Sequence, residues 1–119
     1  MNDYNYIVRI KVKQKEDAGN SWFGRGVADL LHGVEKYHSL NMAAQQMGMA
    51  YSKAWRIMRD AEKAMKIPLL NRMGKQGSEL TPEAEKLLKV YEEAQLAAWR
   101  SVDAVMEQYY GNGKNADKM

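Results

Sequence analysis

The chain has 119 residues, a length that fits one domain with a core of its own. Hydrophobic residues make up 45% and charged residues 28%, which is typical of a soluble globular protein, and no apolar run approaches the ~20 residues of a membrane span. The absence of cysteine excludes disulfides, thiolate metal sites and a cysteine nucleophile, and the N-terminus shows no secretory signal, so we expect a cytoplasmic protein.

The net charge of +3 is distributed unevenly along the chain. Seven basic and three acidic residues lie between Ser39 and Thr81, whereas three basic and six acidic residues lie between Pro82 and Tyr109. The first of these segments is suited to a polyanion such as nucleic acid, and the second is not. On charge alone, an ordinary solvated surface of mixed charge is the alternative.

Apolar and polar side chains alternate near the N-terminus. Between Tyr4 and Lys13 every second residue is apolar, with Ile7 as the exception, and this period of two predicts a half-buried strand. No partner strand is close in sequence, so the strand would pair with a distant hairpin or a second copy of the chain, or lie at an edge. The polar residues 16–21 predict a loop.

Three helices are predicted in the next part of the chain. An apolar stripe from about Val27 to Tyr37 indicates the first. The second follows Ser39, a good N-cap residue, and ends before Gly48, which can adopt a positive φ and turn the chain. A third stripe covers residues 51–66, and two helices joined by a turn of about four residues form a helix-turn-helix.

A hairpin and a long helix follow. Residues 69–80 read as two short extended pieces around a glycine-containing tip. Thr81 as N-cap and Pro82 at the first helical position then start a helix that runs to about Tyr109, about 42 Å in length. We predict one domain over residues 1–110.

The long helix carries an apolar stripe that is too long for a domain of this size to cover alone. It predicts a homodimer, with the two helices antiparallel, whose interface includes Leu88, Tyr91, Ala98, Val102, Val105 and Tyr109. Residues 111–119 are polar and are predicted to be a disordered tail.

Several motifs resemble a known family of DNA-binding domains. The runs Ser39-Leu-Asn-Met-Ala-Ala, Tyr51-Ser-Lys-Ala-Trp-Arg-Ile and Leu80-Thr-Pro are similar to the N-terminal domain of the molybdate regulator ModE, and more widely to LysR-type domains. The resemblance covers about residues 4–109. It implies a mainly α (α+β) fold, a winged helix-turn-helix with an N-terminal strand, a β-hairpin wing and a long C-terminal dimerisation helix. It does not extend to molybdate sensing, and no effector is predicted.

The resemblance also implies which residues meet DNA, with the helix over residues 51–66 in the major groove and the wing on the backbone. Arg56 is the first candidate for a guanine or phosphate contact, because a guanidinium can donate two hydrogen bonds to guanine. For Trp55, packing against a neighbouring helix is favoured over stacking on DNA. The predicted DNA-binding residues are Tyr51, Ser52, Lys53, Trp55, Arg56, Arg59, Lys63, Arg72 and Lys75.

The sequence shows no pattern typical of an enzyme: no nucleophile beside a base, no carboxylate pair and no cofactor loop. His32 and His38 suggest no metal site, since no third ligand accompanies them. We therefore predict a sequence-specific, homodimeric transcriptional regulator that binds double-stranded DNA and needs no cofactor or membrane. The alternatives are a non-catalytic protein-interaction module and a nucleoid-type DNA binder without sequence preference.

Overall fold

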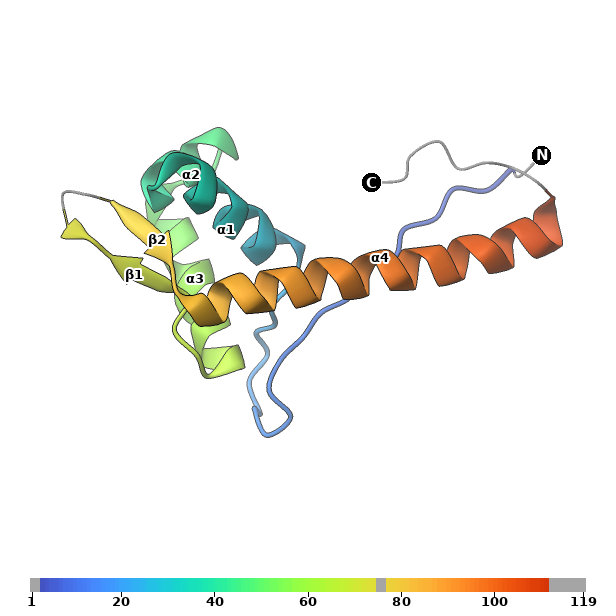
Figure 1. Ribbon diagram of the computed structural model, residues 1–119, viewed down its shortest axis with the longest axis horizontal. Helices are drawn as coiled ribbons and strands as arrows, with labels where there is room; N and C mark the ends of the chain where they lie inside the picture. The colour runs from blue at the N-terminus through green and yellow to red at the C-terminus, as the bar shows by residue number, and fades with distance from the viewer. Residues whose placement is uncertain (1–2, 75–76, 112–119) are drawn as a thin grey trace. The chain divides into compact units, whose positions relative to one another are not determined.

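The computed structural model describes residues 3–74 and 77–111. In chain order, its elements are α1 (Arg25–Tyr37), α2 (Leu40–Gln46), α3 (Tyr51–Met65), β1 (Leu70–Arg72), β2 (Ser78–Leu80) and α4 (Pro82–Tyr110) (Figure 1). This order confirms the predicted winged helix-turn-helix with a long C-terminal helix. None of the helices in the described residues has the length and apolar character that crossing a membrane requires.

The chain forms two compact units. One is Lys11–Val90, which holds α1, α2, α3, the hairpin and the first turns of α4. The other combines the described residues up to Ile10 with those from Tyr91 onward. The predicted tail lies outside the described residues, apart from Gly111.

The three short helices enclose the apolar core of the first unit. Each contributes one buried stripe: Leu30, Leu31 and Val34 from α1, Leu40, Ala43 and Ala44 from α2, and Ala54, Met58 and Ala61 from α3. Small residues allow α1 and α2 to approach closely, and a Cβ added at Gly33 would lie only 2.5 Å from the Cβ of Ala43. The packing of these two helices therefore depends on glycine at position 33.

The predicted signals of the helix-turn-helix are confirmed. The Ser39 hydroxyl accepts a hydrogen bond from the Met42 amide at 3.1 Å, which caps α2. Gly48 adopts a φ of +66° between α2 and α3. The helix over residues 51–66 is α3, with Lys66 as its C-cap in the left-handed conformation.

The predicted N-terminal strand is not formed. Its alternation is present, because Val8 and Ile10 are half-buried while Ile7 is exposed. The partner, however, is a side chain: the Gln95 amide nitrogen donates to the Val8 carbonyl at 2.5 Å, and its oxygen accepts from the Ile10 amide at 2.9 Å. One buried glutamine of α4 thus satisfies the backbone groups that a neighbouring strand would otherwise bind.

Within the second unit, aromatic side chains near the N-terminus also contact side chains of α4. The Tyr6 hydroxyl donates a hydrogen bond to the carboxylate of Asp103, and the Tyr6 ring lies 6.5 Å from the Trp99 ring, measured between centroids. Closer to the terminus, the Tyr4 and Tyr110 rings meet edge to face at 4.7 Å. The N-terminal residues therefore follow α4 to its end.

A loop of the first unit provides a hydrogen-bond donor for a carbonyl at the C-terminal end of α3. The Gln14 amide donates to the Ala64 carbonyl at 3.0 Å, one of the carbonyls that the end of a helix leaves without a partner in the helix. Just before and after this loop, Val12 and Phe23 pair through two backbone hydrogen bonds of 2.9 and 2.8 Å, and Phe23 is fully buried. The buried Phe23 side chain thus anchors the end of the loop in the apolar core.

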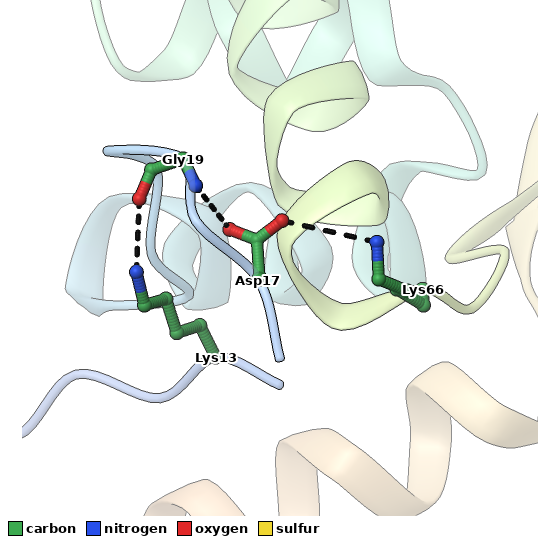
Figure 2. Close-up of polar contacts among 4 residues, drawn as sticks. All are labelled: Lys13, Asp17, Gly19 and Lys66. Atoms are coloured by element: carbon green, nitrogen blue, oxygen red, sulfur yellow. Dashed lines mark hydrogen bonds and ion pairs between the residues drawn. The ribbon is translucent and has the colours of Figure 1, made fainter. Parts of the chain in front are cut away.

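Figure 2 shows the polar contacts that stabilise the conformation of the loop. The Lys13 ammonium donates to the Gly19 carbonyl at 2.8 Å, and the Gly19 amide donates to the Asp17 carboxylate at 3.2 Å. The other oxygen of Asp17 lies 3.9 Å from the Lys66 ammonium, at the C-cap of α3. Asp17 therefore links the turn to the end of the helix.

Two side chains fix the ends of the hairpin. The Thr81 hydroxyl accepts from the Ala84 amide at 3.0 Å, which confirms Thr81 as the N-cap of α4, and it donates to the Pro68 carbonyl at 2.7 Å. The Glu62 carboxylate of α3 accepts from the Leu69 amide at 2.7 Å. The hairpin is therefore tied to α3 at its start and to α4 at its end.

Candidate nucleic-acid interface

The outer face of α3 is basic and open to solvent. Arg56, Arg59 and Lys63 fall within about 60° of one another at 100° per residue, and all three side chains are exposed. They lie on the side of the helix opposite the buried residues Ala54 and Ala61. Within residues 3–74 and 77–111, none of the three pairs with a carboxylate, so their positive charge is not neutralised.

The first turn of α3 adds three more exposed side chains. Tyr51, Ser52 and Lys53 open the helix, and 46% of Tyr51 is exposed. The N-cap residue is Ala50, whose side chain accepts no hydrogen bond. The first turn therefore presents a phenol, a hydroxyl and an ammonium group beside backbone amides that no side chain caps.

The hairpin reaches the same region through Arg72, the last residue of β1. The Arg72 guanidinium carbon lies 3.6 Å from the centroid of the Trp55 ring. On its own helix, the half-buried Trp55 meets the Tyr51 ring edge to face, with 6.2 Å between the centroids. The hairpin and α3 are therefore in direct contact through an arginine stacked on an indole.

A groove of 420 Å³ opens at this contact. Its lining comes from the start of α2, the start of α3 and the hairpin, and includes Ser39, Asn41, Tyr51, Trp55, Arg72 and Ser78. Hydroxyl, amide and guanidinium groups thus surround a space beside the start of α3. They are hydrogen-bonding groups of the kind that bind phosphate oxygens.

Backbone contacts set the position of the hairpin. The Ser78 amide donates to the His38 carbonyl at 3.0 Å, in the turn between α1 and α2. Gly77 approaches the same carbonyl with a φ of +94°, and a Cβ at position 77 would overlap the His38 oxygen. Because Ser78 pairs with Arg72 across the hairpin, this attachment also positions Arg72.

The structure groups the predicted DNA-binding residues in two places. Tyr51, Trp55 and Arg72 meet at the groove, whereas Arg56, Arg59 and Lys63 extend along the outer face of α3. Lys75 lies outside the described residues. The sequence reading missed Asn41 and Ser78 as lining residues and took Ser39 only as a cap, because nothing in the sequence shows where the hairpin folds back.

The predicted dimer residues differ in their exposure within the chain. Leu88 and Tyr91 are buried, with 3% and 4% exposed. Ala98 and Val102 are half-buried, and Val105 and Tyr109 are exposed. A partner can therefore reach only the second half of the predicted stripe.

Three helices followed by a β-hairpin, with a basic helix face beside that hairpin, define a winged helix-turn-helix DNA-binding domain. Residues 29–85 match the family model of the bacterial regulatory helix-turn-helix proteins of the LysR family. This segment, which begins in α1 and ends in the first turn of α4, is therefore a LysR-type helix-turn-helix domain. The protein is accordingly a DNA-binding transcription regulator. A comparison with curated proteins finds no significant match.

Proposed function

We propose that this protein is a homodimeric regulator that recognises a specific sequence of double-stranded DNA, with α3 in the major groove and the hairpin on the backbone. The exposed basic face of α3, with no carboxylate paired to it in the described residues, is the observation that carries the proposal. A guanidinium at Arg56 can read guanine through two hydrogen bonds, while Arg59 and Lys63 suit phosphates.

The test is selection of the purified protein on a random pool of duplex DNA, followed by affinity measurements on the enriched sequence. Arg56→Glu is expected to weaken binding by about a hundredfold, since it removes one contact and adds a charge that DNA repels. Arg100→Glu is the matched control, because it makes the same charge change on an exposed residue of α4. Equal losses in the two variants, or a pool without enrichment, would speak for binding without sequence preference.

The proposed dimer uses a face of α4 that carries no charge. Ala94, Ala97, Ala98, Ser101 and Val105 fall within about 100° of one another on this helix, and each is exposed or half-buried. The charged residues of the same segment lie on other faces. Because the face is formed largely by alanine, two such helices can approach closely, and Ala98 and Val105 in it belong to the interface predicted from the sequence.

Sedimentation tests the dimer separately from DNA binding. The proposal predicts a species of twice 13.6 kDa at micromolar concentration. Ala97→Glu places a carboxylate in the charge-free face and is expected to yield the monomer, whereas Arg100→Glu, which lies off that face, leaves the dimer intact. A monomeric wild-type protein would refute the dimer and leave DNA recognition to be tested by itself. The likeness to the ModE domain stays a prediction.

A further inference from the structure

The contact between Arg72 and Trp55 joins two elements that both face the groove. The guanidinium carbon is 3.6 Å from the ring centroid, a distance at which the cation lies against the π-face. Trp55 belongs to α3 and is half-buried, which restricts its ring. Arg72 belongs to the hairpin and is exposed.

This stacking leaves the hydrogen-bonding capacity of Arg72 unused. The five N–H donors of a guanidinium lie in its plane, so an indole against one face does not occupy them. In the part of the chain that the structure describes, Arg72 forms no ion pair with a carboxylate. The side chain is thus held in place, and no other described residue pairs with its charge or accepts a hydrogen bond from its donors.

The surroundings indicate what these donors bind. Arg72 lines the 420 Å³ groove together with Ser39, Asn41 and Ser78, whose hydroxyl and amide groups are neutral hydrogen-bonding groups. Among the described residues that line it, the groove includes no carboxylate, and it lies beside the first turn of α3. A neutral polar lining with one fixed guanidinium favours an anion, and a guanidinium binds a phosphate through two parallel hydrogen bonds.

We propose that Trp55 is a positioning residue, which holds Arg72 at the groove so that the guanidinium binds a backbone phosphate of the DNA. The inference rests on the proposed function, since it requires α3 to be the recognition helix. It assigns Trp55 a role through Arg72, without direct contact between the indole and DNA. A flexible arginine would be free to leave the groove, whereas a stacked one is preorganised for the phosphate.

The test measures the affinity for one duplex over a range of salt concentrations. Arg72→Ala is expected to reduce the slope of log K against log salt by about 0.9, the value for one phosphate contact, with an affinity loss of about tenfold. Trp55→Leu, which keeps apolar bulk without a π-face, is expected to lose about fivefold, and Trp55→Phe, which keeps the π-face, less than twofold. In the Arg72→Ala background, Trp55→Leu is expected to cause no further loss.

Thermal unfolding of each variant separates this coupling from a loss of fold, and Trp55→Met, which also lacks a π-face, replaces Trp55→Leu should that variant fail to fold. Equal losses from Trp55→Leu with and without Arg72 would overturn the inference, because Trp55 would then act independently of Arg72. An unchanged salt slope in Arg72→Ala would overturn it as well. In both cases a large effect of Arg56→Glu would leave the proposed function standing. If Arg56→Glu also had no effect, the proposed function itself would fail.

Discussion

Replacing Gly33 with alanine places a methyl group where α1 and α2 touch. The new Cβ would lie 2.5 Å from the Cβ of Ala43 and 3.1 Å from its Cα, whereas carbon atoms pack best at about 3.5–4.0 Å. Neither atom of Ala43 can rotate away, since one is backbone and the other is fixed to it. The two helices would have to separate by about 1 Å at their contact.

Two opposing effects determine how Gly33→Ala changes the free energy of unfolding. Overpacking a core by one methyl group typically costs about 1–3 kcal/mol. The cost is near the upper end of this range where the backbone has to move. Alanine in place of glycine inside a helix returns about 1 kcal/mol. We therefore expect Gly33→Ala to lower the free energy of unfolding by about 1–2 kcal/mol.

Gly26 in the same helix is the matched control. Apart from its chain neighbours and the backbone of its own helix, no described atom lies within 4 Å of a Cβ added there, so Gly26→Ala is expected to stabilise the protein by about 0.5 kcal/mol. Urea unfolding with an unchanged m value measures both variants. The reasoning fails if Gly33→Ala raises the midpoint as Gly26→Ala does. It gains support if Ala43→Gly restores the stability of Gly33→Ala.

Three further predictions follow from single hydrogen bonds. Thr81→Val is expected to cost about 2 kcal/mol, because the Pro68 carbonyl and the first turn of α4 lose a partner, and a urea midpoint equal to that of the wild type would contradict this. Ser39→Ala is expected to cost about 1 kcal/mol by the same measurement, and an effect no larger than that of replacing an exposed helical serine, as in Ser52→Ala, would argue against the cap. Gln95→Ala is expected to speed hydrogen exchange at the Ile10 amide, and equal protection in both proteins would show that this amide does not depend on the glutamine.

The parts of the fold that could be predicted from the sequence are those with local causes. Ser39 and Gly48 mark the limits of α2, and Thr81 with Pro82 starts α4, because a cap acts through backbone groups within a few residues. The basic face of α3 could also be predicted, since the position of a side chain around a helix follows from its spacing.

The parts that could not be predicted depend on residues far apart in the chain. An alternating pattern predicts one buried face for residues 4–10 but not what they pair with, and a single glutamine within the apolar stripe of α4 gives no sign that Gln95 is the partner. In the same way, the sequence favours packing of Trp55 against a neighbouring helix and assigns Arg72 to the wing, with no sign that the two side chains stack on each other. Such pairs form only when the chain has folded.

The attachment of the hairpin to the His38 carbonyl limits how this region can vary among relatives. The contact uses a main-chain amide and the missing side chain of Gly77, so most substitutions on the surface of the hairpin leave it unchanged. An insertion or deletion between β1 and Gly77 would alter the tip but keep the attachment. Related chains should therefore differ in hairpin length on the tip side and retain glycine immediately before β2, a pattern that an alignment of such chains can reveal.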